Sequence, residues 1–228
     1  MIEAKNPYEY TTTFTLQPVI KRRRGVVFSQ TEIKHLLISL GIVIAIGVSM
    51  TINPFGDSLF EYTGIIGAFG IGILFASIFL THEIAHKIAA QKNGLWAEFR
   101  LIPMGALLTV ISIFSPFFKI ISPGAVMIGG IYADRKIIGK VAFAGPLTNL
   151  ILSPLFLLVA IFAFVVNPII FIIAAYGSLF NGWIALLNLI PFGILDGYKI
   201  FQWNKALWAV AFISSIALAA TTYFFLFL

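Results

Sequence analysis

Long apolar runs constrain this chain more than any other feature of its sequence. A helix needs about 20 apolar residues to cross the hydrocarbon core of a bilayer. The 228 residues are 60% hydrophobic and 11% charged, with a mean hydropathy of +1.00. We therefore expect an integral membrane protein without a sizeable soluble domain. The predicted membrane-spanning helices cover about residues 35–50, 62–92, 141–166, 169–196 and 206–228.

Residues 101–133 are also apolar, but prolines and glycines interrupt them. The β-branched and aromatic residues of 107–114 favour a strand, so we predict a membrane-embedded β-hairpin or re-entrant segment that protein shields from lipid. A broken pair of short helices is the alternative. The predicted fold class is therefore a mainly α membrane protein with about five to six transmembrane helices and this embedded region.

Charged residues predict which loops lie inside the cell. Lys and Arg concentrate in the arm of residues 1–34, around 87–100 and in the segments 135–140 and 199–205. The loop before residue 62 and the turn at Asn167-Pro168 contain neither. The positive-inside rule then predicts a multi-pass protein of the cell membrane whose N-terminus is cytoplasmic. We expect a polar, hairpin-like arm over 1–34, followed by a single polytopic domain over 35–228.

A short motif places ionisable side chains at the end of the second apolar run. His82 and His86 stand four residues apart, so on a helix they project from one face and can reach a single ion. Glu83 lies beside that face, where a carboxylate can take a proton from a metal-activated water. A charge at the centre of a membrane helix costs about 2.5–3.5 kcal/mol, which favours a functional interpretation. A polar cluster between helices is the alternative.

A catalytic zinc site commonly uses three protein ligands, and the chain has no cysteine to offer. The carboxylates after the motif and within the apolar region are Glu98, Asp134 and Asp196. We expect the first two in wetted connections, whereas Asp196 would end an apolar helix. Gly197 would then let the backbone approach the metal. Asp196 is therefore the predicted third ligand, at one depth with the histidines and Asn149 near the cytoplasmic face.

Three motifs together resemble the site-2 protease family of intramembrane zinc metalloproteases. They are His82-Glu83-Ile84-Ala85-His86, Gly145-Pro146-Leu147-Thr148-Asn149 and the segment from Asn188 to Gly197. The resemblance covers roughly residues 62–200, the expected catalytic core, and leaves no room for a PDZ domain. It implies one Zn²⁺ held by His82, His86 and Asp196, with Glu83 as catalytic base and Asn149 in support. It also implies that the substrates are transmembrane segments of regulatory proteins.

The chain departs from the family pattern at a few positions. Ala85 stands where many members have glycine, and Tyr198 where a second glycine is frequent. The prolines that many members carry near Gly193 and Ile194 are missing. These differences concern the substrate channel more than the metal ligands.

Further roles and competing functions follow from the same residues. Asn149 or Asn188 could orient a substrate or help to hold an oxyanion, and the strand-like region could pair with an extended substrate. The expected partners are transmembrane protein substrates and membrane lipid. Nucleic acid is not expected, because the net charge of +6 is scattered between apolar runs.

Three other functions compete with proteolysis of this kind. A divalent-metal transporter would tend to show internal repeats. A metalloprotease of the prenyl-protein-processing kind would use a later Glu as its third ligand. A non-catalytic membrane adaptor would not need Glu83.

Overall fold

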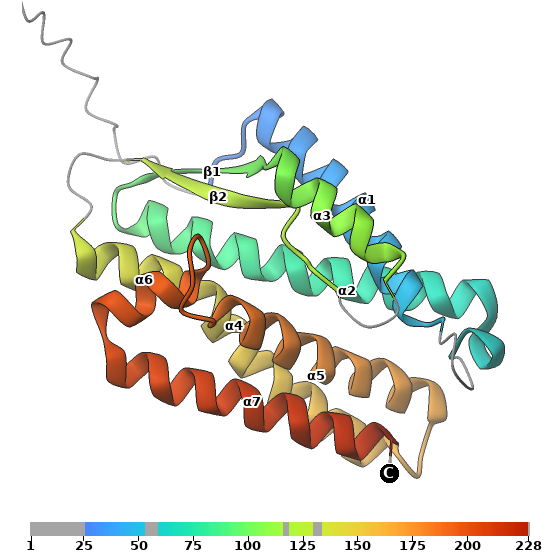
Figure 1. Cartoon of the computed structure of the whole chain (residues 1–228). Coiled ribbons are helices and arrows are strands. Elements are labelled where there is room, and N and C mark those ends of the chain that lie inside the picture. Colours follow the sequence, from blue (N-terminus) through green and yellow to red (C-terminus); the bar gives the residue numbers. More distant parts are fainter. Residues whose placement is uncertain (1–25, 53–58, 116–118, 130–133, 228) are drawn as a thin grey trace, which may run out of the picture.

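The computed structural model describes residues 26–52, 59–115, 119–129 and 134–227 (Figure 1). Five of its helices are long and apolar enough to cross a membrane, so the predicted multi-pass membrane fold is confirmed. In chain order the elements are α1 (Gln30–Met50), α2 (Leu59–Lys92), β1 (Trp96–Leu101), α3 (Pro103–Ile113), β2 (Gly124–Gly129), α4 (Arg135–Ala163), α5 (Pro168–Asn188), α6 (Asp196–Trp203) and α7 (Lys205–Phe227).

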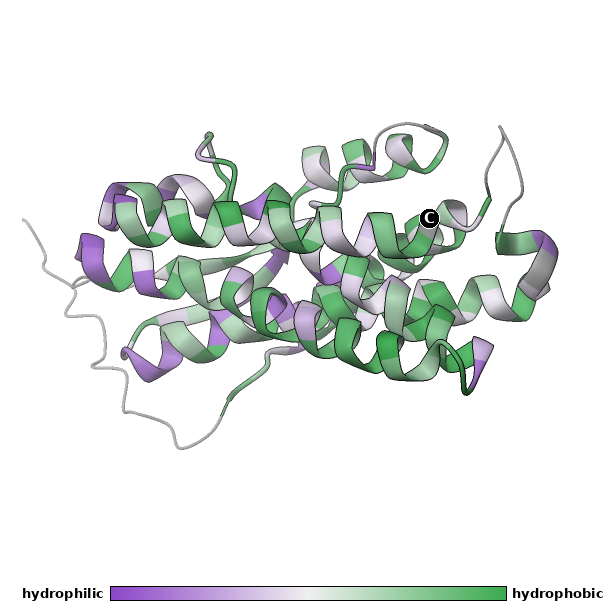
Figure 2. Ribbon diagram, turned by 90° about the horizontal axis from the view of Figure 1, so that it is seen from below, coloured by the Kyte–Doolittle hydropathy of each residue, from purple (hydrophilic) through white to green (hydrophobic). Residues whose placement is uncertain are grey.

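Helix α2 runs through the middle of the molecule and is covered on two sides. Figure 1 shows α1, α3 and the two strands on one side of it, and the four helices α4 to α7 on the other. Hydrophobic residues extend along the long helices, and hydrophilic segments gather mainly at one end of the bundle (Figure 2). Polar residues in the last turns of α2 are therefore enclosed between two layers of protein.

The embedded region contains a β-sheet, but its strands differ from the predicted ones. Residues 107–114 were expected to form a strand, whereas Pro103–Ile113 is helix α3. Proline is pre-organised for the first turn of a helix, and α3 then packs along α1. The Thr109 hydroxyl donates to the Gly105 carbonyl at 2.7 Å, so its polar group is satisfied within the helix. The strands lie on either side of α3 in the chain and pair antiparallel, with Trp96 opposite Gly129 and Leu101 opposite Gly124.

Two helix boundaries also differ from the prediction. Helix α1 begins at Gln30, inside the predicted arm, because the Ser29 hydroxyl caps it by accepting from the Glu32 backbone amide at 3.0 Å. Residues 1–25 of that arm, and the predicted turn at 53–57, lie outside the described residues.

The fourth predicted span was wrong at its C-terminal end. Helix α5 ends at Asn188, and Asp196 opens the separate helix α6 instead of ending a long one. Pro191 cannot continue the hydrogen-bonding pattern of α5. The positive φ of 56° at Gly193 then turns the chain. This break delivers the Asp196 carboxylate from a short helix that packs against α4.

Candidate metal centre

His82, Glu83 and His86 lie on a buried stretch near the C-terminal end of α2, with exposed fractions of 2%, 8% and 5%. Asp196 reaches them from the first turn of α6. Its Oδ2 lies 2.9 Å from His86 Nε2 and 3.7 Å from His82 Nε2. The two Nε2 atoms are 3.0 Å apart. Three potential ligand atoms therefore converge on one point.

This spacing fits a tetrahedral zinc ion. Ligands that are 2.0–2.1 Å from such an ion lie about 3.3 Å from one another, and the distances between the three atoms extend from 2.9 to 3.7 Å. Among the described residues, His82, His86 and Asp196 form the one group of three or more His, Asp or Glu side chains close enough to hold a metal. Two neutral imidazoles and a carboxylate also suit the preferences of zinc.

Gly145 on α4 keeps this point free of side chains. A Cβ atom at position 145 would lie 2.7 Å from His82 Nε2 and 2.6 Å from His86 Cε1. The sequence motif contains Gly145, but its role was not recognised. A glycine inside an apolar helix costs about 1 kcal/mol relative to alanine, and that cost was the signal that could have identified a close approach.

The other ring nitrogen of each histidine has a protein partner. His86 Nδ1 lies 2.8 Å from the Val141 carbonyl oxygen, and His82 Nδ1 lies 2.5 Å from Asn149 Oδ1. A carbonyl only accepts, so His86 carries its proton on Nδ1 and leaves the Nε2 lone pair free. Histidine ligands in metal sites are held in this way by a second acceptor.

Asn149 and Asn188 take different positions. The Asn149 amide lies between His82 and Asn181 of α5, whose Oδ1 accepts from Asn149 Nδ2 at 2.9 Å. Asn181 was not predicted from the sequence. The Asn188 amide donates to the Ile184 carbonyl of its own helix at 3.0 Å. In the described part of the chain no hydrogen bond joins Asn188 to the histidines.

Two predictions need correction, one for Glu98 and one for Gly197. Glu98 was expected in a wetted connection, but it is buried in β1, where it accepts from the Ser29 hydroxyl and from Arg100. Gly197 was expected to bring the backbone close to the metal. Instead, a Cβ there would collide with the Leu189 carbonyl, so Gly197 lets α6 pack on the end of α5. Asp134 caps α4 by accepting from the Ile137 backbone amide at 2.7 Å.

The two oxygens of Asp196 have different neighbours. Oδ2 faces the histidines, whereas Oδ1 accepts from Lys199 Nζ at 3.2 Å. Burial alone would raise the pKa of this carboxyl, but its charged and polar neighbours, Lys199 among them, hold the pKa well below its usual value. Asp196 is therefore an anion that is available to a cation.

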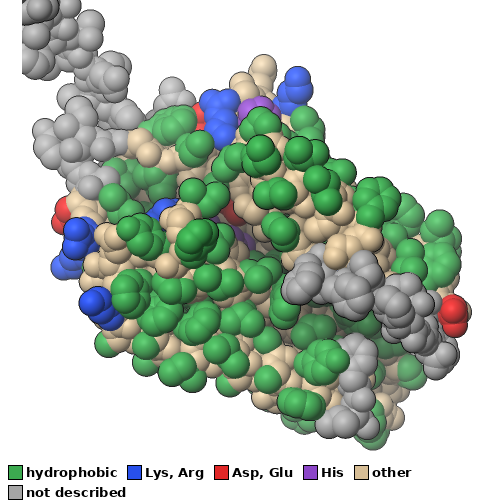
Figure 3. Space-filling model, viewed as in Figure 1, with side chains coloured by type: hydrophobic (Ala, Val, Ile, Leu, Met, Phe, Trp, Pro, Cys, Tyr) green, Lys and Arg blue, Asp and Glu red, His purple; other side chains and the backbone are tan. Residues whose placement is uncertain are grey.

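Glu83 is outside the three-ligand group but beside it. The backbone amide of Val126 in β2 lies on the side of the Glu83 carboxylate. Figure 3 shows acidic and histidine side chains recessed between hydrophobic ones in the middle of one face of the molecule. A carboxylate beside a metal position, with one edge of a strand next to it, is an arrangement suited to hydrolysis.

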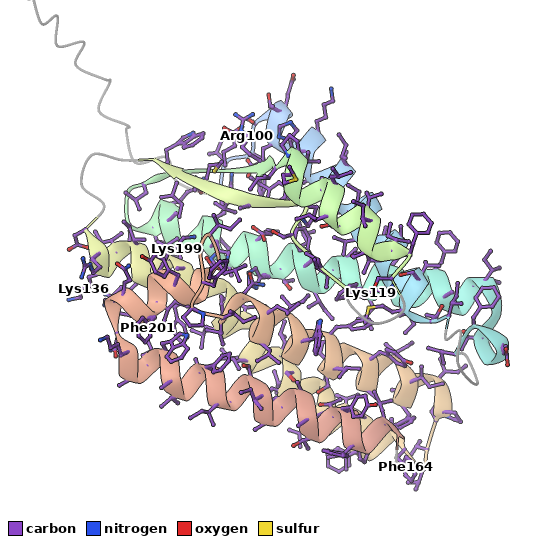
Figure 4. All side chains as sticks on the ribbon, viewed as in Figure 1. Arg100, Lys119, Lys136, Phe164, Lys199 and Phe201 are labelled. Carbon is purple, nitrogen blue, oxygen red and sulfur yellow. The ribbon has the colours of Figure 1, made fainter. Side chains whose placement is uncertain are left out.

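The centre lies nearer to one end of the bundle. His82 precedes the end of α2 at Lys92 by ten residues, or about 15 Å. In Figure 4, Lys199 on α6 and Lys136 at the start of α4 lie in the same half of the molecule, whereas Phe164 marks the opposite end. Lys136 and Lys199 therefore lie at the end that is closer to the site, whereas Lys119 lies in the other half of the molecule.

Comparison with known proteins gives matching relatives. A protein of Methanocaldococcus jannaschii with the name "Putative zinc metalloprotease MJ0611" is 35% identical over 185 residues, which are 80% of this chain and 90% of that protein. Proteins of two Mycobacterium tuberculosis strains with the name "Putative zinc metalloprotease Rip3" are 33% identical over 146 residues, 62% of this chain and 33% of each relative. No family model and no solved structure matches the chain.

The match to the archaeal protein extends over most of both chains. The name of that protein agrees with the five apolar helices and with the group of His82, His86 and Asp196 found here. The chain belongs to the site-2 protease family of intramembrane zinc metalloproteases.

Proposed function

We propose that this protein hydrolyses peptide bonds within or near transmembrane segments of other proteins. The observation that carries the proposal is the convergence of His82, His86 and Asp196 beside Glu83, all enclosed within a bundle of membrane-spanning helices. Ionisable side chains inside a membrane carry an energetic cost, so their presence there indicates a function. A hydrolytic zinc site is a function that accounts for all four residues.

Each residue of the centre has a proposed role. His82, His86 and Asp196 hold one Zn²⁺, which when bound supplies a Lewis acid for the activation of water and the polarisation of a carbonyl. Glu83 accepts a proton from the attacking water and returns it to the leaving amine, as a general base and then a general acid. Asn149 orients His82, and a contact with the substrate is a further role for its amide. A role of Asn188 at the substrate or the oxyanion stays a prediction.

The outer edge of β2, which pairs with no other strand in the described part of the chain, offers a means of binding an extended substrate. Phe99 and Leu101 of β1 donate their backbone amides to Glu32 and His35, so these residues face away from β2. In an antiparallel pair their partners Val126 and Gly124 must also face outward. The Val126 amide faces Glu83. A substrate strand added at this edge would pass the catalytic carboxylate and find backbone partners that lipid cannot provide.

The proposed setting is the cell membrane, with the N-terminus and the active site toward the cytoplasm. The site lies in the half of the bundle that carries Lys136 and Lys199 (Figure 4), and Lys92 ends α2 ten residues after His82. The positive-inside rule assigns these basic residues to the cytoplasmic side. Lipid would contact the apolar outer faces of the helices, and transmembrane proteins would be the substrates.

A divalent-metal transporter is less well supported. A pathway would require ligands at successive depths, whereas the described residues contain one such group. A non-catalytic adaptor would have no use for Glu83 at the site.

The test is cleavage of a panel of single-span model substrates by the purified full-length protein, with metal content measured in parallel. We expect Glu83→Gln to lower cleavage at least about 10²-fold while about one zinc per chain remains. Glu61→Gln, an exposed substitution in the first turn of the same helix, is the matched control and should retain activity. Equal cleavage by wild type and Glu83→Gln would refute the proposed mechanism, and wild type without bound metal would refute the site.

A further inference from the structure

We propose that Asn181 sets the tautomer of His82 through Asn149, and thereby sets the zinc affinity of the centre. This inference rests on the proposed metal site. It makes Asn181 a positioning residue that contacts neither the metal nor the substrate. Its amide lies on α5, the helix that packs against α4.

The residues form an unbroken chain of hydrogen bonds through the interior. Asn181 Nδ2 donates to the Gly177 carbonyl at 2.8 Å, and Asn181 Oδ1 accepts from Asn149 Nδ2 at 2.9 Å. Asn149 Oδ1 then lies 2.5 Å from His82 Nδ1. Both asparagines are fully buried and His82 is 2% exposed. No bulk water can therefore replace a missing partner.

The direction of this chain is fixed at its far end. A backbone carbonyl can only accept, so the Asn181 amide must turn its NH₂ group toward Gly177 and its oxygen toward Asn149. That oxygen requires a donor, so Asn149 must turn its own NH₂ group toward Asn181. The remaining Asn149 oxygen requires the proton of His82 on Nδ1. The lone pair of His82 is thus left on Nε2, the atom that faces His86 and Asp196.

The two histidines differ in how firmly their tautomer is fixed. His86 donates directly to the Val141 carbonyl, which can only accept a hydrogen bond. His82 is held by a side-chain amide, which can rotate and present its NH₂ group instead. Such a rotation would favour a His82 tautomer with the proton on Nε2, and that tautomer cannot ligate a metal. Asn181 prevents the rotation, so the effect of losing it should appear at His82.

The test uses variants of the full-length protein in detergent and measures zinc affinity by competition with a chelator. We expect Asn181→Leu to weaken zinc binding about 10- to 100-fold, as loss of other outer-sphere partners does. Asn181→Ser should weaken it similarly, because a serine hydroxyl can bond back to Gly177 but is too short to reach Asn149. This second variant keeps the test valid if the leucine variant does not fold.

Two further variants separate polarity from packing. Asn181→Asp, when its carboxyl is protonated, can donate to Gly177 and accept from Asn149, so it should retain affinity within a few-fold. Ser178→Ala is the matched control, because Ser178 also makes a buried polar contact on α5, to Thr222 at 2.8 Å, without a link to His82. It should bind zinc as tightly as wild type. The visible spectrum of bound Co²⁺ should change in Asn181→Ser and remain unchanged in Ser178→Ala.

The outcomes distinguish this inference from the proposed function. Wild-type affinity in both Asn181→Ser and Asn181→Leu would overturn the inference, and so would an equal loss in Ser178→Ala. A wild-type protein that binds no zinc would overturn it together with the metal site. If wild type binds zinc but cleaves no substrate, the proposed protease function fails while the affinities still test the role of Asn181.

Discussion

His86 and Lys87 are consecutive residues of α2, both buried, and they face different layers of the molecule. Lys87 Nζ donates to both oxygens of Glu32 at 2.6 and 2.7 Å and to the Ala97 carbonyl at 3.0 Å. The Phe99 backbone amide also donates to Glu32, at 3.0 Å. This cluster joins α1, α2 and β1, and its positive and negative charges balance.

The cluster around His86 is chemically different. There the nitrogen and oxygen atoms that converge are lone-pair donors, and they face one another at 2.9 to 3.7 Å. Such an arrangement needs a cation, whereas the Lys87 cluster contains its own. The comparison teaches that burial and charge alone do not identify a site. A buried cluster in which a cation and an anion pair stabilises the fold. A cluster in which lone-pair donors converge without a cation can bind one.

The largest expected effect comes from filling the metal position. Gly145→Ala should abolish zinc binding and cleavage, because the added methyl group would collide with both imidazoles. Helix content should be retained, since alanine favours helices. Metal analysis and circular dichroism of purified protein would check this. Gly70→Ala, where a Cβ meets nothing within 4 Å, is the control. Normal zinc content in Gly145→Ala would show that the ion binds elsewhere.

Breaking the ion pair of Lys87 and Glu32 should lower the stability of the fold and leave the metal in place. Removing one partner of a buried ion pair leaves the other charge uncompensated, so Glu32→Gln should lower the free energy of unfolding by about 3–5 kcal/mol. Denaturant titration in detergent would measure this. Glu98→Gln breaks the pair with Arg100, whose side chain is 33% exposed, and should cost less than Glu32→Gln. Loss of zinc from folded Glu32→Gln would contradict the separation between the two clusters.

Chelation of the metal should have a smaller effect. The imidazoles and Asp196 are held by Asn149, the Val141 carbonyl and Lys199, so the centre keeps its arrangement without an ion. At a zinc concentration about 100-fold above the dissociation constant, the bound ion adds about 2.7 kcal/mol. Removal should then lower the Tm by about 5–10 °C with helix content unchanged. A loss of helix on chelation would show that the metal organises the bundle.

Lys199 should have the smallest effect. Its side chain is 38% exposed and lies 3.2 Å from the Asp196 oxygen that faces away from the histidines. An exposed ion pair contributes about 0–1 kcal/mol, so Lys199→Gln should change zinc affinity by less than about tenfold. Competition with a chelator would measure the change. A larger loss would mean that Lys199 determines how Asp196 is placed.

The sequence was sufficient to predict the features that depend on residue type and spacing along the chain. The apolar runs predicted the five long helices. The positions of His82, His86, Asn149 and Asp196 along three predicted helices placed these residues at one depth. The predicted ligands do lie together, because helix geometry fixes which side chains share a face. Their roles as ligands and of Glu83 as base still await experiment.

The sequence was insufficient where a residue's role depends on its neighbours in space. The β-branched residues after Pro103 favoured a strand, but packing against α1 determined a helix. Nothing around Asn181 indicates that its amide would meet Asn149, since many membrane helices use asparagine for packing. Lys87 was assigned only to a basic membrane flank, because its partner Glu32 lies 55 residues earlier.

The bonds from Glu32, His35 and Lys87 to β1 have a consequence for association between molecules. They occupy Phe99, Leu101 and Ala97, the backbone groups on the outer edge of that strand. An unpaired strand edge is a template for pairing with any extended chain, including a second copy of the same protein. With this edge occupied, the described sheet has only the β2 edge left for an incoming chain. The same contacts therefore remove β1 as a site for edge-to-edge pairing with a second copy.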